Sequence, residues 1–275
     1  NWAQWDSILN IPHQIYISPY DPERHIWVSE RGGNGVHEQI LKFSNDGSRL
    51  VMQLRDPNPV GTREEARANS NPGPLDFGAN ASLAFLPDGS FLLADGYWNS
   101  RLVKYTADGE YVMEWGELGT GPGQFDTPHG IAVSPDDEIF VADRGNRRIQ
   151  VFDPDGNYLR EFIIDVPVDL TRGKITYGSE NPNGTRGTMA PGAPDALCMT
   201  PGPNPVLFVG DIYPSRIYKV SLEGEVLGVY GQPGRNLGEF GWIHAIACPS
   251  EDEIWVGELI NWRVQKLVTK GTGTR

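Results

Sequence analysis

Short runs of hydrophobic residues recur along the chain and are separated by turn-forming clusters of Pro, Gly, Asn and Asp. In residues 129–162, for example, four such runs are joined by the segments SPDDE, DRGN and DPDGN. Runs of this length, rich in β-branched and aromatic residues, are typical of β-strands. No stretch keeps a 3.6-residue apolar period for ten residues, which argues against long helices. The pattern therefore predicts an all-β fold.

The same four-run pattern repeats along the chain. Five copies can be aligned, at residues 13–54, 81–115, 129–162, 195–231 and 244–268. A repeat of about 45 residues with four strands is typical of a propeller blade. We therefore predict one β-propeller domain over residues 1–275, with five recognisable four-stranded blades. The last copy has only three clear runs, so we expect residues 2–8 to supply its fourth strand and to cover the exposed sheet edge.

The first strand of three copies opens with a histidine: His13, His129 and His244. The other two copies have Ala81 and Asp195 at this position. Because the first strand of each propeller blade lines the central channel, we expect the three imidazoles to face a common axis. Such a site suits Zn²⁺, with Zn–N distances of about 2.0–2.1 Å and an open ligand position. Another divalent cation that binds imidazole, such as iron, copper or nickel, is an alternative.

The non-functional alternative is that histidine is merely a tolerated residue at the opening of a strand. Only five histidines occur in 275 residues, and three of them share this one repeat position. We therefore favour the metal site for these three. For His25 and His37, which lie elsewhere in the first copy, we expect an ordinary surface location.

The second strand of every copy ends in an acidic residue: Glu30, Asp95, Asp143, Asp211 and Glu258. The residues that follow lie on the same face as the histidines, because the first and second strands are antiparallel. Tyr97 and Arg144 are the candidates there for a catalytic base and for a bidentate grip on a carboxylate. Tyr213 and Arg31 occupy the corresponding positions of other blades, where a packing role is equally open. Two inserts on this face, residues 55–76 and 164–193, are expected to wall a pocket.

The charge and the cysteines limit the possible partners and compartment. The formal net charge of −13 disfavours nucleic acid and anionic membranes as partners, and the apolar runs have the length of strands rather than of membrane spans. The sequence opens at Asn1 without a leader, from which we expect a secreted or periplasmic protein, with a cytoplasmic one as the alternative. Cys198 and Cys248 each lie in an apolar run and are expected to be small buried hydrophobic residues.

Residues 94–162 resemble peptidyl-α-hydroxyglycine α-amidating lyase, an NHL-repeat β-propeller, through DGYWNSR, GPGQFDTPH and VADRGNRRIQ in tandem. The resemblance implies a zinc ion bound by the three strand-opening histidines. It also implies a catalytic Tyr97 and an essential Arg144, with Arg31 in place of a further arginine of the first blade. The family cleaves the C–N bond of a C-terminal α-hydroxyglycine to give an amide and glyoxylate. Tyr97 would take the hydroxyl proton, and Arg144 would stabilise negative charge.

The sequence departs from this family in three respects. The family has six blades, whereas five copies are found here. Trp98, Val141 and Val151 stand where the family has disulfide cysteines. Ala245 replaces an aspartate that helps to bind a structural calcium ion, so the resemblance does not carry a calcium site over.

Three functions are compatible with these residues. The first is a zinc-dependent lyase acting on an α-hydroxyglycine-type substrate, either a peptide C-terminus or a small metabolite. The second is a metal-dependent hydrolase of an ester, lactone or amide at the same histidines, which would release no glyoxylate. The third is a non-catalytic NHL interaction propeller, which leaves the aligned histidines unexplained.

Overall fold

The computed structural model describes residues 2–32, 38–57, 59, 61–69, 71–168 and 190–269. The chain divides into two compact units, Asn1–His129 and Gly130–Arg275, which we call unit 1 and unit 2. The single domain expected over residues 1–275 stays a prediction. No helix in the described ranges is long and apolar enough to span a membrane.

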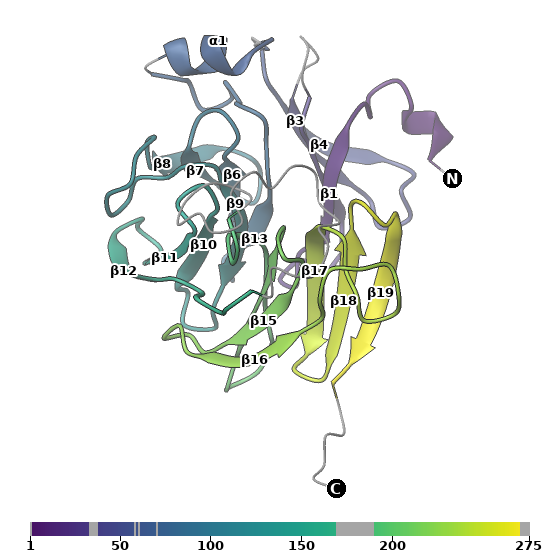
Figure 1. The fold of residues 1–275 in the computed structure, drawn as a ribbon. Helices are drawn as coiled ribbons and strands as arrows, with labels where there is room; N and C mark the ends of the chain where they lie inside the picture. The colour runs from purple at the N-terminus through teal and green to yellow at the C-terminus, as the bar shows by residue number, and fades with distance from the viewer. Residues whose placement is uncertain are drawn as a thin grey trace, which may run out of the picture. The chain divides into compact units, whose positions relative to one another are not determined.

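Unit 1 contains two four-stranded antiparallel sheets whose strands pair in sequence order (Figure 1). Blade 1 consists of β1 (Pro12–Ile17), β2 (Ile26–Glu30), β3 (Gln39–Phe43) and β4 (Leu50–Arg55). The short helix α1 (Arg63–Ala68) follows it. Blade 2 consists of β5 (Leu83–Phe85), β6 (Phe91–Asp95), β7 (Arg101–Tyr105) and β8 (Tyr111–Trp115).

Unit 2 contains the other three sheets. Blade 3 consists of β9 (Pro128–Val133), which begins at the end of unit 1, with β10 (Ile139–Asp143), β11 (Arg148–Phe152) and β12 (Tyr158–Phe162). Blade 4 consists of β13 (Pro194–Met199), β14 (Leu207–Asp211), β15 (Ile217–Val220) and β16 (Val226–Tyr230). Blade 5 has three described strands, β17 (Ile243–Ser250), β18 (Glu253–Glu258) and β19 (Arg263–Val268), which lie side by side in Figure 1. The predicted all-β fold of the β-propeller class is confirmed.

The burial of each strand follows its place in the blade. The second strands β6, β10 and β14 are buried at every residue, because both of their faces are covered by apolar side chains. The outer strands β4, β12 and β16 alternate between partly buried and more exposed positions, as expected for strands with one solvated face. The apolar clusters lie between neighbouring sheets. One example is the packing of Trp27 of blade 1 against Phe85 and Phe91 of blade 2.

The expected N-terminal strand of the last blade is wrong. Ala3–Trp5 forms a short 3₁₀ helix, and the rings of Trp2 and Trp5 pack against Phe43 of blade 1. The indole N–H of Trp5 also donates a hydrogen bond to the carbonyl of Gly47 at 2.8 Å. The tryptophans make the segment look like a strand in sequence, but they serve as a cap on an apolar face of blade 1.

The prediction that the two cysteines are separate buried residues is also wrong. Cys198 of β13 and Cys248 of β17 form a disulfide. Cys248 is indeed buried, at 4% exposure. The sequence showed the apolar run around each cysteine, but not that the opening strands of blades 4 and 5 place the two side chains together.

Candidate active site

A β-bulge opens the first strand of blades 1, 4 and 5. In each of these blades the pairing with the second strand skips one residue, which lies outside the ladder. A bulge re-aims the side chain of its extra residue, and bulges are common beside active sites. The extra residues are His13, Asp195 and His244.

The acidic residue that ends the second strand holds the loop in front of this bulge. In blade 1, Glu30 accepts the backbone N–H of Ile11 at 2.8 Å, two residues before His13. In blade 5, Glu258 accepts the N–H of Gly241 at 2.9 Å. The acidic residues that mark the repeat in the sequence are therefore structural, and they fix where the strand-opening side chains begin.

Three side chains of unit 1 meet at one point. The phenol oxygen of Tyr97 lies 2.9 Å from Nε2 of His129 and 3.2 Å from Nε2 of His13. The two imidazole rings are 5.5 Å apart and nearly perpendicular. His129 is fully buried, whereas His13 is partly exposed, so the cluster has one side open to solvent.

The backbone fixes the orientation of the His13 ring. Its Nδ1 lies 2.7 Å from the carbonyl oxygen of Ala81. A carbonyl can only accept a hydrogen bond, so Nδ1 carries the proton and Nε2 presents its lone pair toward Tyr97. A histidine held in this way by a backbone carbonyl is the usual arrangement of a metal ligand.

A glycine allows Tyr97 to approach His129. A Cβ atom on Gly96 would lie 1.7 Å from the carbonyl oxygen of Pro128, so only glycine fits there. Because Gly96 precedes Tyr97 and Pro128 precedes His129, this contact brings the two functional residues together. The glycine of the DGY motif is thus explained by packing.

Arg31 contacts the aromatic ring of the same tyrosine. Its guanidinium carbon lies 4.4 Å from the centre of the Tyr97 ring, in a cation–π contact. A positive charge facing the ring stabilises negative charge on the phenol oxygen. The packing role and the functional role that the sequence left open for Arg31 are therefore compatible.

Arg144 and Asp195 form a buried ion pair in unit 2. Nη1 of Arg144 lies 2.6 Å from Oδ1 of Asp195, and both residues are at most 4% exposed. The other oxygen of Asp195, Oδ2, accepts the indole N–H of Trp242 at 3.2 Å. Sequence reasoning missed Asp195 and Trp242 as site residues, although Asp195 already aligned with the histidines.

His244 and Tyr213 also lie in unit 2. The His244 ring is 6.5 Å from that of Trp242, its near neighbour in sequence. The Tyr213 side chain is buried, and this burial raises the pKa of its phenol; the Arg216 charge lowers it and the Asp211 charge raises it. A place for Tyr213 in the site therefore stays a prediction, as does the meeting of His244 with the other two histidines.

His13 and His129 fit a divalent cation. Their ligand atoms lie within 4.8 Å of each other, and both Nε2 atoms face one phenol oxygen. The single phenol proton can serve only one imidazole lone pair at a time, whereas a cation can accept both. A further donor would complete the three-histidine set of a catalytic zinc site.

A buried carboxyl supports the loop behind His13. Glu38 is 2% exposed and accepts the backbone N–H groups of Ala79 (2.7 Å) and Asn80 (3.0 Å), just before Ala81. Burial raises the pKa of Glu38 to about 9; the neighbouring Asp95 carboxylate also raises it, while the two N–H groups lower it. Glu38 is therefore neutral at pH 7, which no sequence pattern indicated.

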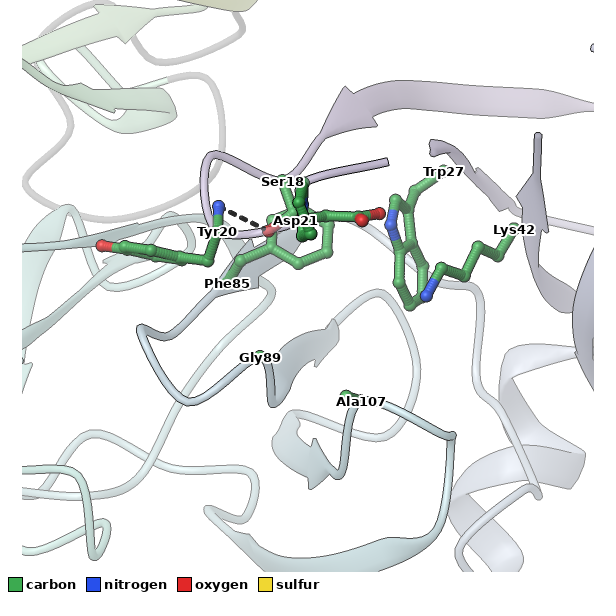
Figure 2. A pocket seen from close by; sticks show the side chains of 9 residues that line it. Ser18, Tyr20, Asp21, Trp27, Lys42, Phe85, Gly89 and Ala107 are labelled. Atoms are coloured by element: carbon green, nitrogen blue, oxygen red, sulfur yellow. Dashed lines mark hydrogen bonds between the residues drawn. The ribbon is translucent and has the colours of Figure 1, made fainter. Parts of the chain in front are cut away.

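The surface location expected for His25 is wrong. His25 is 7% exposed, and its Nδ1 lies 2.7 Å from Oδ2 of Asp21. Asp21 also borders a pocket of about 160 Å³ with Trp27 and Phe85 (Figure 2). This pocket begins at Ser18, past the far end of β1, so about 16 Å of extended chain separates it from His13. His37 lies outside the described residues.

The two inserts differ in what the structure describes. The first contains α1, which begins with a capping box between Thr62 and Glu65, and its last residues bind Arg101 through the carbonyls of Pro72 and Gly73. This segment is therefore anchored to blade 2. Most of the second insert, residues 169–189, lies outside the described residues. The expected pocket wall stays a prediction for both.

Comparison with known proteins places these residues in context. The NHL repeat family matches residues 125–152. The peptidylglycine alpha-amidating monooxygenase of Rattus norvegicus is 31% identical over 258 residues, which are 92% of this chain and 23% of that protein. The peptidyl-alpha-hydroxyglycine alpha-amidating lyase 1 of Drosophila melanogaster is 26% identical over 280 residues, covering 98% of this chain and 46% of that protein. The chain thus spans less than half the length of these curated relatives.

A solved structure supports the fold. A selenomethionine-substituted virginiamycin B lyase from Staphylococcus aureus superimposes with a TM-score of 0.55 at 17% identity, over 94% of this chain and 67% of that one. At this identity the likeness shows the fold alone. The resemblance found in the sequence is confirmed: the chain is similar to amidating lyases over most of its length and carries an NHL repeat.

Proposed function

We propose that this chain is a metal-dependent lyase that cleaves the C–N bond of an α-hydroxyglycine-type substrate to an amide and glyoxylate. The observation that carries the proposal is the phenol oxygen of Tyr97, within hydrogen-bond distance of Nε2 of both His13 and His129. The names of the relatives support lyase chemistry of this type. No comparable observation favours a hydrolase.

The metal would be held by His13, His129 and His244. Zinc is the cation that this donor set suits best, with another divalent ion as the alternative. When bound, the cation would polarise substrate oxygens as a Lewis acid. We include His244 in this set because it is the extra residue of a bulge in β17 that corresponds to the bulge of His13 in β1. Without the family's aspartate at Ala245, we do not extend the proposal to a structural calcium ion.

Tyr97 would move the proton. As the phenolate, which Arg31 favours by its charge over the ring, it takes the proton of the substrate hydroxyl group. The oxygen then forms the carbonyl of glyoxylate while the C–N bond breaks, and its electron pair stays on nitrogen. Tyr97 returns the proton to that nitrogen, which leaves as the amide. Protons and electrons therefore balance without an external base.

Arg144 would bind the carboxylate of the substrate and stabilise negative charge. A guanidinium offers a planar set of donors that matches a carboxylate. The substrate would be the C-terminus of a peptide or a small molecule with the same end group. Nucleic acid and anionic membranes are not proposed as partners, because the net charge of −13 would repel both.

The disulfide supports a location outside the cytosol. Structural disulfides persist in oxidising compartments and are rare where thiols are kept reduced. Cys198 and Cys248 are the only cysteines of the chain, and they pair with each other. We therefore propose that the protein is secreted or periplasmic.

Glyoxylate release from an N-acyl-α-hydroxyglycine, together with metal content by elemental mass spectrometry, tests this function. We expect about one zinc per chain and stoichiometric glyoxylate and amide, both lost in His129→Ala. His25→Gln is the matched control, since His25 lies away from the cluster, and it should keep both. Release of a carboxylic acid without glyoxylate would indicate a hydrolase. A wild-type protein that binds no metal and turns over no substrate would leave an interaction propeller.

A further inference from the structure

We infer that Asp195 is a positioning residue that orients Arg144 toward the carboxylate of the substrate and ties it to the segment in front of His244. This inference rests on the proposed function, because it assigns the carboxylate to Arg144. Asp195 itself touches no reacting atom. Its effect is exerted through the two side chains that it binds.

Asp195 lies at a position where the backbone already aims side chains into the site. It is the extra residue of the bulge in β13, as His13 is in β1 and His244 is in β17. In each case the preceding residue pairs with the acidic residue that ends the second strand. The repeat therefore presents a carboxylate in blade 4 where other blades present an imidazole.

Both oxygens of this carboxylate are engaged, each by a different blade. Oδ1 accepts from Arg144 of blade 3 at 2.6 Å, and Oδ2 accepts from Trp242, just before blade 5, at 3.2 Å. The guanidinium is planar and rigid, so one bond to Nη1 fixes the plane in which its other N–H groups point. The Asp195 carboxylate thereby sets the direction of the arginine.

Because the ion pair is buried, Asp195 holds the Arg144 guanidinium firmly in one orientation. Asp195 is fully buried and Arg144 is 4% exposed. A buried charge is costly unless it is paired, so the arginine gains much from keeping its carboxylate partner. In a polar, exposed pair the same contact would be weak and interchangeable.

Trp242 extends the link to the strand that carries His244. Its backbone has a φ of 56°, in the left-handed region that bulky residues rarely adopt. Two bonds hold it there: its N–H donates to Oγ of Ser215 at 3.1 Å, and its indole N–H donates to Asp195. The disulfide between β13 and β17 closes the same connection further along both strands. Asp195 thus joins the arginine of blade 3 to the histidine strand of blade 5.

Asp195→Asn keeps the size and shape of the side chain and removes its charge, so it tests the inference most directly. We expect KM for an N-acyl-α-hydroxyglycine to rise about ten- to a hundredfold, with a smaller change in kcat. The preference for this substrate over its C-terminal amide should fall by a similar factor, because a misdirected arginine no longer selects the carboxylate. Zinc content should not change.

Glu138→Gln is the matched control, because Glu138 is a carboxylate of unit 2 that also pairs with an arginine: its oxygens accept from Nη1 and Nη2 of Arg160 at 2.7 and 2.8 Å. Glu138 directly precedes β10, at the opposite end of that strand from Arg144. The variant should keep the selectivity of the wild type. An Asp195→Asn variant with unchanged KM and unchanged selectivity would overturn the inference. So would an equal loss of selectivity in Glu138→Gln.

Binding of glyoxylate by isothermal titration calorimetry separates this inference from the proposed function. If the wild type releases no glyoxylate from any substrate, the lyase proposal fails, but carboxylate binding by Arg144 can still be measured. At least tenfold weaker glyoxylate binding in Asp195→Asn than in Glu138→Gln would support the positioning role. Equal binding by the two variants, or no binding by the wild type, would refute it.

Discussion

Arg31 and Arg144 occupy the same position in blades 1 and 3, directly after the acidic residue that ends the second strand, yet they face different partners. Arg31 stacks on the ring of Tyr97, whereas Arg144 pairs with Asp195. The strand-opening residue of the following blade explains the difference. In blade 2 it is Ala81, which offers no charge, and in blade 4 it is an aspartate. The repeat supplies the arginine, and its neighbour determines what the arginine does.

Removal of the phenol O–H of Tyr97 should have the largest effect. Tyr97→Phe keeps the ring on which Arg31 stacks and removes the group that transfers the proton. We expect kcat to fall by about 10²- to 10⁴-fold, the usual contribution of a general base, with KM within a few-fold of the wild type. Steady-state glyoxylate release measures both constants. A kcat within tenfold of the wild type would assign the tyrosine to packing alone.

The disulfide should matter next, because both of its cysteines lie in unit 2. A Cys198→Ala, Cys248→Ala double variant should lose about 2–4 kcal/mol in its free energy of unfolding, measured by urea denaturation. Amide hydrogen exchange should rise in β13 and β17, which carry Asp195 and His244. The strand β1 and the Tyr97 segment should keep their protection. Equal loosening of both units would contradict a local cross-link.

Paired arginine-to-lysine changes address the comparison itself. Arg144→Lys replaces a planar fork by a point charge, and we expect kcat/KM to fall about ten- to a hundredfold. Arg31→Lys retains a cation able to sit over the Tyr97 ring, so its loss should stay below about tenfold. Both variants are measured with the same N-acyl-α-hydroxyglycine. A larger loss of kcat/KM in Arg31→Lys than in Arg144→Lys would show that the cation–π contact depends more on the shape of the guanidinium than the ion pair does.

The smallest expected effect is on the pH dependence of stability. Glu38 has a pKa of about 9 in the folded protein, whereas the ordinary pKa of a glutamate is 4.5. Between these pH values the folded state holds a proton that the unfolded state has lost, so this group makes the free energy of unfolding fall as pH rises. In Glu38→Gln the slope between pH 5 and pH 9 should be shallower. Denaturation at several pH values measures it, and identical slopes would show that Glu38 is ionised when folded.

The sequence predicted the fold and part of the site because both depend on repeated local patterns. Strand runs and turn residues recur in every copy, and alignment of the copies alone placed His13, His129 and Tyr97 on one face. The contacts between blades were not predictable in this way. The disulfide, the cap formed by Trp2 and Trp5, and the burial of His25 and Glu38 all depend on which surfaces meet after folding.

Asp195 lies between these two cases. Its alignment with the histidines was visible in the sequence, but an aspartate at the opening of a strand is also a common turn residue. Only the structure shows its two partners, Arg144 and Trp242, which lie about 50 residues before and after it in the sequence. The position of Asp195 was predictable from the repeat, whereas its role is seen only from its contacts with the neighbouring blades.

The bulge at the opening of the first strand has a consequence for how such a protein can change over time. Its extra residue takes no part in the ladder, so its side chain can be exchanged while the hydrogen bonds of the sheet remain as they are. Blades 1, 4 and 5 therefore share one backbone frame with an exchangeable side chain at this position. A single substitution at such a position can change the ligand set without breaking the ladder, provided that the partners of the old side chain are also satisfied.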